Sequence, residues 1–195
     1  MSYHLSGEYD MAQSILEEFR KTLLHRSMPL SDKFFDNEYS ELLLYQNLVL
    51  RDSQQYNDAL HHLQIYEKAI FNKLTLKEIR YEIYLHLKSF DRAQLLAREL
   101  IERNNENKNY YFMLEKSLNL NHIDERRKLY DELIDKYPKA DAPKQIQLEL
   151  LTGEPFRQVI GSYLQRGLEK GVPALFQSVK YLYSSSEKVR CSKFN

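Results

Sequence analysis

The sequence predicts an all-α protein built from repeated helical hairpins, and three observations lead to that prediction. The 195 residues include only 5 glycines and 5 prolines, fewer turn formers than a β-sandwich or β-barrel of this length needs. Leu, Glu, Lys and Arg, which are good helix formers, are abundant. Hydrophobic residues make up 43% of the chain, which is enough for a core and too much for an intrinsically disordered protein. The third observation is a repeat of 33 or 34 residues.

A short pattern recurs five times along the chain. In most copies an aromatic or large apolar residue is followed, three residues later, by a small or apolar one. The copies begin at Tyr9, Tyr56, Phe90, Ile123 and Phe156. The last three intervals are 34, 33 and 33 residues, and a tetratricopeptide repeat has 34. Residues 1–195 are therefore predicted to form a single array of about five tetratricopeptide-like hairpins that wind into a right-handed superhelix.

The same register predicts which residues face the core. Four residues after the small position, each copy carries a core residue: Leu16, Leu63, Ala97, Tyr130 and Tyr163. Three residues further on, the predicted core positions are Phe19, Tyr66, Leu100 and Leu133, whereas Arg166 does not fit. Six residues before an anchor, the first helix of a hairpin contributes Leu50, Tyr84, Ser117 and Leu150.

Capping residues predict where several helices begin. Thr75 and Glu78 have the spacing of a capping box, which would start a first helix. Asp36 or Asn37 is predicted to cap the helix that runs to residue 50, after a long loop over residues 24–36 that accounts for the first, 47-residue interval. Asp141 precedes another helix, which has a proline in its first turn, where proline is tolerated.

Glycine and proline predict the later boundaries and the ends of the array. Gly153 followed by Pro155 predicts the loop inside the last hairpin, and Gly171 followed by Pro173 predicts the exit from it, before a helix over residues 174–183. Residues 1–5 have the pattern of the end of a helix, and another helix begins at Glu187. We therefore expect the array to be truncated at both ends, with self-association of the chain through its exposed repeat ends.

The charge balance and cysteine usage exclude several classes of protein. The chain has 28 basic and 28 acidic residues, so no overall field attracts nucleic acid or an anionic membrane. No apolar run approaches the roughly 18 residues of a membrane helix, and the start has no secretory signal. Cys191 is the only cysteine, which excludes an intramolecular disulfide and favours a reducing compartment. The sequence predicts a soluble, cytoplasmic protein with no membrane segment and no nucleic-acid motif.

The sequence carries no motif for catalysis or cofactor binding. It has no glycine-rich phosphate loop, no cysteine pair for zinc, and no HExxH or HxxxH pattern among its six histidines. His61 and His62 are adjacent, so on a helix they point about 100° apart. Carboxylate pairs such as Glu17 and Glu18 are typical of a solvated helix face. We expect no catalytic residue, no metal site and no bound cofactor.

A partner of such an array binds on the concave surface, which is formed by the first helix of each hairpin. The register places these candidate partner-binding residues there: Glu41, Leu44, Leu48, Arg51, Glu78, Glu82, Lys108, Tyr111, Glu115 and Lys144. The mixed charge of this set differs from the basic clamps that capture a terminal carboxylate in some chaperone-binding repeats.

Two features of this set are open to more than one interpretation. Glu78 and Glu82 are like charges one turn apart, so either a basic partner relieves their repulsion or both are solvated. Tyr110 and Tyr111 are adjacent among the chain's 15 tyrosines, so one is expected to face the core and the other to be exposed. An exposed tyrosine on a scaffold is a candidate for a binding hot spot.

Several stretches resemble the auxiliary subunit of the NatA N-terminal acetyltransferase. They are residues 15–21 (ILEEFRK), 38–47 (EYSELLLYQN), 102–107 (ERNNEN), 110–111 (YY), 114–116 (LEK) and 151–156 (LTGEPF). Their order and spacing match the family across nearly the whole chain, from about residue 3 to 189. The ending over residues 190–195 departs from the family, and the loop over 24–36 differs as well.

This resemblance implies a non-catalytic tetratricopeptide scaffold that wraps a small catalytic subunit of the GNAT fold. The family directs that subunit towards nascent chains that begin with Ser, Ala, Thr, Gly or Val, and tethers it to the ribosome. Acetyl-CoA binds the catalytic partner, so no cofactor is expected on this chain. The present sequence resembles an internal part of the family's array.

Three hypotheses about function remain. The first is a scaffold subunit for co-translational N-terminal acetylation, with no activity of its own. The second is a stand-alone tetratricopeptide adaptor that binds peptides or proteins. The third, an enzyme in its own right, requires the chain alone to acetylate a peptide.

Overall fold

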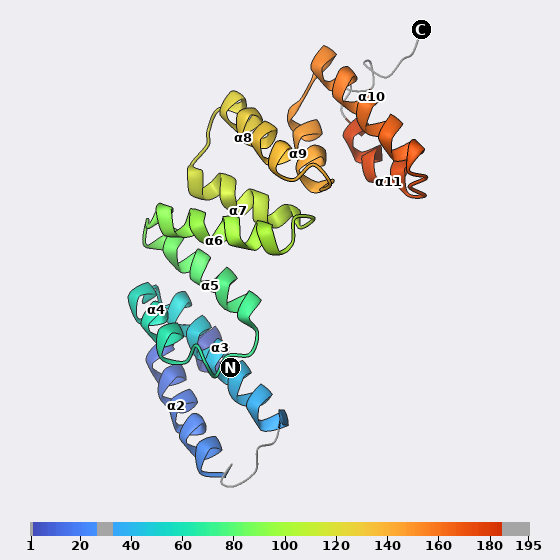
Figure 1. Cartoon of the computed structure of the whole chain (residues 1–195). Helices are drawn as coiled ribbons and strands as arrows, with labels where there is room; N and C mark the ends of the chain where they lie inside the picture. The colour runs from blue at the N-terminus through green and yellow to red at the C-terminus, as the bar shows by residue number, and fades with distance from the viewer. Residues whose placement is uncertain (1, 27–32, 185–195) are drawn as a thin grey trace. The chain divides into compact units, whose positions relative to one another are not determined.

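The computed structural model describes residues 2–26 and 33–184, and every regular element within those ranges is helical (Figure 1). The predicted all-α class is therefore confirmed. The predicted helix from Glu187 and the lone Cys191 lie outside the described residues. The elements are α1 Ser2–Leu5, α2 Tyr9–Arg26, α3 Lys33–Asp52, α4 Tyr56–Ile65, α5 Lys73–His86, α6 Phe90–Arg103, α7 Lys108–Leu118, α8 Ile123–Lys136, α9 Ala142–Leu150, α10 Gly153–Glu169, α11 Leu175–Lys180 and the 3-10 helix η1 Tyr181–Ser184.

The helices begin where the repeat register places them. Four of the five predicted anchors are the first residues of α2, α4, α6 and α8. The fifth, Phe156, lies in the first turn of α10. Each second helix follows a first helix, so the hairpins are α1–α2, α3–α4, α5–α6, α7–α8 and α9–α10. No helix in the described part of the chain has both the length and the apolar character needed to cross a membrane.

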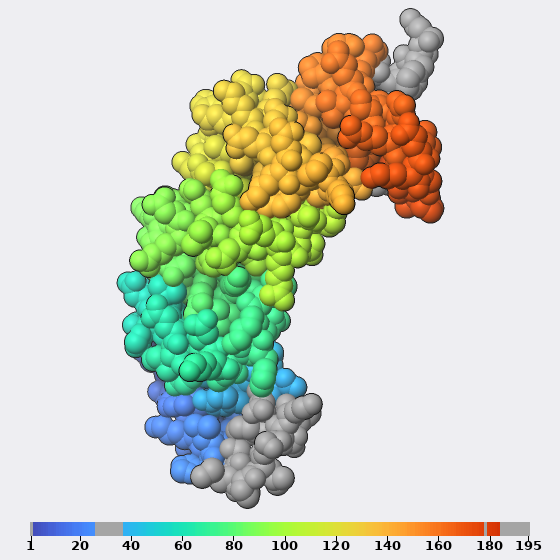
Figure 2. All heavy atoms as spheres, in the orientation of Figure 1, coloured from blue at the N-terminus to red at the C-terminus, as the bar shows by residue number. Residues whose placement is uncertain are grey.

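The chain divides into two compact units, Met1–Leu96 and Ala97–Asn195, with the boundary inside α6. In unit 1, α3, α4 and α5 pack around one apolar cluster, which consists of Leu43, Ala59, Leu63, Ile70, Leu76, Ile79 and Ile83. In unit 2, α9, α10 and α11 enclose a second cluster, which consists of Leu148, Leu151, Phe156, Ile160, Val179 and Leu182. Figure 2 shows one face of the molecule with every heavy atom drawn.

Most of the predicted core positions are buried. Leu63, Ala97, Tyr130 and Leu100 have no exposed surface. Phe19 is the exception, because half of its side chain is exposed, so the prediction is wrong there. The neighbouring first helix, α1, has only four residues, too few to run along the 18 residues of α2, and its His4 also hydrogen-bonds Tyr45 and Asp52 of α3. The later turns of α2 are therefore left without a covering helix on that side.

Some predicted boundaries are also wrong. Residues 24–26 and 33–36 are helical, so the predicted loop over 24–36 is shorter than its composition indicated. A single proline, Pro29, is the only strong breaker in that stretch. Because α3 begins at Lys33, Asp36 and Asn37 lie within the helix and do not cap it. Gly153 and Pro155 lie in the first turn of α10, where proline fits as well as it does in a loop.

The predicted capping box at the start of α5 is replaced by a different cap. The helix begins at Lys73, and the side chain of Asn72 accepts a hydrogen bond from the backbone N–H of Thr75 at 3.1 Å. Asparagine is among the strongest N-cap residues and is preferred over threonine. Thr75 therefore donates its amide to the cap instead of providing the cap.

This cap gives a first testable prediction. Replacing Asn72 with alanine leaves the Thr75 amide without a side-chain acceptor, and we expect the free energy of unfolding to fall by about 1 kcal/mol. Urea denaturation followed by circular dichroism measures the change. The matched control is Thr75→Ala, which should cost clearly less. If the control cost as much as Asn72→Ala, the capping-box interpretation would be correct after all.

Candidate functional site

The exposed side of α3 and α5 is the first-helix face of unit 1. Glu41 is exposed on α3, and Leu44 and Leu48 are half-buried one and two turns further along. Leu44 also packs against the apolar core of this unit. Arg51 ends the row, and its guanidinium Nη1 donates to the carboxylate Oε2 of Glu82 on α5 at 2.5 Å. The structure therefore brings five of the predicted partner-binding residues together.

The ion pair with Arg51 neutralises Glu82, one of the two glutamates that lie one turn apart on α5. Glu82 faces an arginine of the same chain, so no basic partner is needed to offset its repulsion with Glu78. The side chain of Glu82 is 56% exposed, and ion pairs at such exposure contribute at most about 1 kcal/mol. The pair links the first helices of two successive hairpins and leaves Glu41, Leu44 and Leu48 as the open part of the face.

On the exposed side of α7 and α9, the first-helix face of unit 2, Lys108 belongs to a three-residue network. Its ammonium Nζ donates to the Glu149 carboxylate at 3.2 Å and to the Tyr181 hydroxyl at 3.0 Å. The Tyr181 hydroxyl in turn donates to the same Glu149 oxygen at 2.7 Å. Burial, followed by the hydrogen bond to Glu149, raises the pKa of Tyr181. The network joins α7, α9 and η1, so Lys108 acts within the chain.

Tyr111 and Glu115 do not lie on this face, which corrects the sequence register for α7. Tyr111 is fully buried, its ring centroid lies 6.3 Å from that of Tyr130 on α8, and its hydroxyl donates to the Asn105 carbonyl at 2.8 Å. Glu115, one turn further on, forms an ion pair with Arg126 of α8 at 3.0 Å. Both side chains therefore point into their own hairpin.

The expectation that one of two adjacent tyrosines is exposed is also wrong. Tyr110 and Tyr111 are 3% and 0% exposed. A first helix inside an array is covered on two sides, by its own second helix and by the next hairpin, and α7 does contact α9. Two residues 100° apart can therefore both be buried.

The aromatic side chain that α7 does expose is Phe112, which sequence reasoning missed. Its side chain is 39% exposed. Asn109 and Lys116 are exposed at the matching spacing of three before and four after it, so these residues share one side of the helix. A register shifted by one residue would have found this row. The sequence does contain the pattern that predicts this row: a polar, an aromatic and a basic residue at helical spacing.

Lys144 lies on α9, away from the Lys108 network. It lines a cavity of about 500 Å³ and donates to the Pro138 carbonyl at 2.6 Å. Burial is the largest cause that lowers the pKa of Lys144, and the nearby Lys170 and Arg166 lower it further.

The start of α9 shows how neighbouring hairpins are held together. The carboxylate of Glu106, which precedes α7, accepts hydrogen bonds from the backbone N–H groups of Asp141 and Ala142 at 3.0 and 3.1 Å. Asp141 occupies the N-cap position, as the sequence predicted, but its side chain makes no capping hydrogen bond. A carboxylate from the preceding hairpin fills that role and is favoured by the helix dipole.

Several charged groups on these faces form ion pairs and caps between helices of the chain. Within residues 2–26 and 33–184, no group of three or more histidine, cysteine, aspartate or glutamate side chains could hold a metal ion.

The comparisons with known proteins agree with this geometry. The family described as N-terminal acetyltransferase A, auxiliary subunit, matches residues 37–193, which is most of the chain. The chain belongs to this family. It is 42% identical over 189 residues to the human N-alpha-acetyltransferase 16, NatA auxiliary subunit, and 41% identical to the mouse protein of the same name. The N-terminal acetyltransferase A complex auxiliary subunit NAA15 of Arabidopsis thaliana is 30% identical over 197 residues.

A solved structure of the family has the same fold. A chain from the structure of Naa15/Naa10 bound to HypK-THB superposes with a TM-score of 0.77 and 34% identity, over 97% of this chain and 28% of that one. The tetratricopeptide-like helical-repeat fold predicted from the sequence is thereby confirmed. The match to the human and mouse auxiliary subunits covers 97% of this chain but 21% of theirs. The present chain thus spans about a fifth of the length of these auxiliary subunits.

Proposed function

We propose that this chain is part of the non-catalytic scaffold of an N-terminal acetyltransferase complex, where it supports a GNAT-fold catalytic subunit. The observation that carries the proposal is the similarity, over 97% of the chain, to a chain solved in a complex with Naa10. Acetyl-CoA then binds the catalytic subunit and not this chain. The complex as a whole acts on nascent chains at the ribosome, in the cytoplasm.

The first-helix faces support this proposal. The Arg51–Glu82 ion pair joins the first helices α3 and α5 in unit 1, and the Lys108–Glu149 ion pair joins α7 and α9 in unit 2. Other side chains on these faces are exposed or half-buried. Glu41 with Leu44 and Leu48 forms the open part in unit 1, and Phe112 forms it in unit 2. Apolar side chains flanked by charges are suited to stable contact with a protein.

A co-purification experiment tests the proposal. The chain is expressed with a tagged GNAT-fold catalytic subunit of the NatA type, and we expect the two to elute together. The catalytic subunit should then acetylate a peptide that begins with Ser or Ala faster than it does alone. The chain by itself, with acetyl-CoA, should give no product. Product from the chain alone, or a catalytic subunit that elutes without it, would contradict the proposal.

Matched variants locate the contact. Phe112→Asp introduces a charge at the centre of the exposed row on α7, and we expect capture of the catalytic subunit to fall about tenfold, as for loss of an aromatic anchor. Leu95→Asp is the control, because Leu95 is 62% exposed on α6, a second helix. The control should leave capture unchanged. Equal losses in both variants would show that the first-helix face is not the contact surface.

A further inference from the structure

The cavity lined by Lys144 lies in unit 2 and has both polar and apolar lining residues. It lies between α9, α10 and the residues that lead into α11, with Ile134 of α8 at one side. Its volume of about 500 Å³ falls within the range of ligand-binding clefts in proteins. Gly167 helps to close it, because a Cβ at that position would lie 2.5 Å from the side chain of Leu175. The absence of a side chain lets α10 and Leu175 meet.

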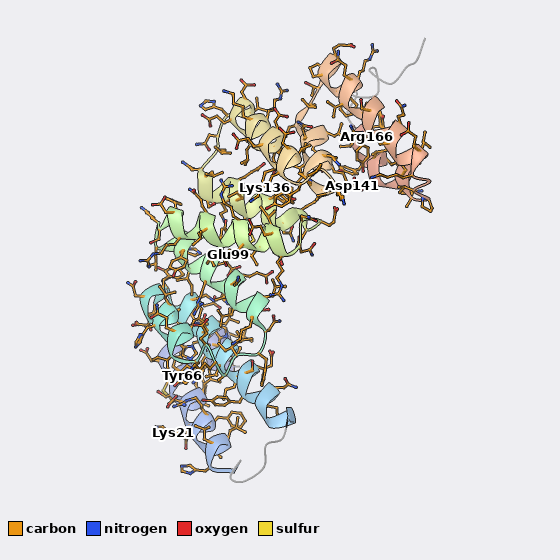
Figure 3. The ribbon with its side chains drawn as sticks, in the orientation of Figure 1. Lys21, Tyr66, Glu99, Lys136, Asp141 and Arg166 are labelled. Carbon is orange, nitrogen blue, oxygen red and sulfur yellow. The ribbon has the colours of Figure 1, made fainter. Side chains whose placement is uncertain are left out.

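Three cationic side chains line this cavity: Lys144 from α9, Arg166 from the last turn of α10, and Lys170, which directly follows α10. Figure 3 labels Arg166 on α10 and Asp141 at the start of α9. Arg166 and Lys170 form no ion pair with any residue that the structure describes. Among the residues that the structure describes, Asp141 is the only acidic one in the lining, and the Glu106 carboxylate lies next to it on the backbone N–H groups of Asp141 and Ala142. Positive charges therefore outnumber negative ones in the lining itself.

These three cations line the same cavity. Burial is the largest effect on the pKa of Lys144 and lowers it; Asp141 opposes this, and Lys170 and Arg166 lower the pKa further. Like charges in a partly enclosed site repel, and an anion bound among them would remove that repulsion. The planar fork of an arginine also matches the geometry of a carboxylate.

The remaining lining distinguishes between kinds of anion. Four of the lining side chains are apolar, and we call them the apolar wall: Ile134, Val159, Val172 and Leu175. The lining also includes amide and hydroxyl groups: Gln145, Gln147, Gln158, Ser162 and Tyr163. A polyphosphate compound would leave the apolar wall without a partner. A peptide that carries both acidic and large apolar side chains would use every part, because amides and hydroxyls can satisfy its backbone N–H and C=O groups.

We propose that this cavity binds a short acidic segment of a partner protein, with carboxylates paired to Lys144, Arg166 and Lys170 and a large apolar side chain against Val159, Val172 and Leu175. The site is defined by residues of this chain alone. It therefore goes beyond the scaffold function and does not depend on the identity of the catalytic subunit.

Peptide binding to the whole chain, measured by fluorescence anisotropy, tests the site. The probe is a labelled peptide, blocked at both ends, with two central leucines flanked by aspartates. One comparison peptide has asparagines in place of the aspartates, and another has serines in place of the leucines. We expect saturable binding of the probe, and at least about tenfold weaker binding of both comparison peptides.

Two variants of the chain assign the binding to the cavity. The double variant Arg166→Gln, Lys170→Gln should weaken binding of the probe by about tenfold or more. Its control is Arg103→Gln, Lys128→Gln, which removes the same net charge from exposed positions on α6 and α8 and should leave binding unchanged. Val172→Glu places a competing carboxylate at the half-exposed edge of the cavity and should also abolish binding. Thermal unfolding of each variant shows that it is folded.

The outcomes are distinct. Equal weakening by the Arg103, Lys128 control would overturn the proposal, because binding would then follow net charge. Equal binding of the asparagine peptide, or tripolyphosphate competing with the probe as well as unlabelled peptide does, would overturn it too. Co-purification with the catalytic subunit is measured on the same double variant. Unchanged capture together with lost peptide binding supports a separate site, whereas retained peptide binding in that variant overturns the assignment whatever the capture shows.

Discussion

Replacing His62 with leucine is expected to make the stability of the chain less sensitive to acid between about pH 6.5 and pH 4. His62 lies on α4, with its ring centroid 4.8 Å from that of Tyr66, which is labelled in Figure 3. Both ring nitrogens are buried, and neither has a hydrogen-bond partner in the described part of the chain. Burial, with a further effect of the nearby Arg20, lowers the pKa of His62 from 6.5 to about 4.

The direction of the effect follows from where the proton binds more tightly. The unfolded chain takes up the His62 proton near pH 6.5, whereas the folded chain takes it up only near pH 4. Protonation of His62 therefore does not change the free energy of unfolding above pH 6.5. As the pH drops from 6.5 to 4, it lowers that free energy. The difference between the two pKa values corresponds to about 3 kcal/mol.

Other groups act in a different range of pH. The pKa of Glu17 is held below its usual 4.5 mainly by its hydrogen bond to Arg20, and that of Glu67 by its hydrogen bond to Arg80. These carboxylates contribute stability that is present above pH 4.5 and is lost below it. Between pH 4.5 and 6.5, the difference between the wild-type chain and His62→Leu therefore reports on the histidine.

Urea denaturation at a series of pH values measures this effect. We expect the wild-type chain to lose about 3 kcal/mol more than His62→Leu between neutrality and pH 4. The adjacent His61→Gln is the control, because His61 is exposed, and it should keep the wild-type profile. Parallel profiles for the wild-type chain and His62→Leu would show that His62 is solvated in the folded protein.

The repeat fold could be predicted because it depends on a periodic pattern. Ala59 and Ala93 are small because two helices meet there, and both are fully buried. The pattern that contains these positions recurs in each hairpin. A single register therefore predicted the first residues of α4, α6 and α8 correctly. The repeat pattern lies within short stretches of sequence, and each further copy strengthens the prediction.

The faces of individual helices could not be predicted to the same accuracy. A shift of one residue rotates a side chain by about 100°, so the register that served the second helices placed Tyr111 on an exposed face where Phe112 lies. Helix caps provided by residues far away in the sequence could not be predicted either. Glu106 caps α9 from a position 35 residues earlier in the chain, and no local pattern records that contact. The cationic cavity likewise requires residues of α9 and α10 to be brought together.

Truncation of Tyr111 is expected to cost far more stability than truncation of its neighbour Phe112. Tyr111 has no exposed surface, packs against Tyr130 and donates a hydrogen bond to the Asn105 carbonyl. Removing a buried aromatic ring leaves a cavity, and we expect Tyr111→Ala to lower the free energy of unfolding by about 3–5 kcal/mol. Phe112→Ala removes a ring that is 39% exposed, and should cost about 1 kcal/mol or less.

The same pair of variants separates stability from binding. Tyr111→Phe keeps the ring and loses only the hydroxyl, so we expect a cost of about 1 kcal/mol and unchanged capture of the catalytic subunit. Phe112→Ala should keep nearly full stability and weaken capture. The register inferred from the sequence instead makes Tyr111 a contact residue. Urea denaturation and co-purification on these variants decide between the two registers, because a stable Tyr111→Ala chain that no longer captures its partner would refute the structural assignment.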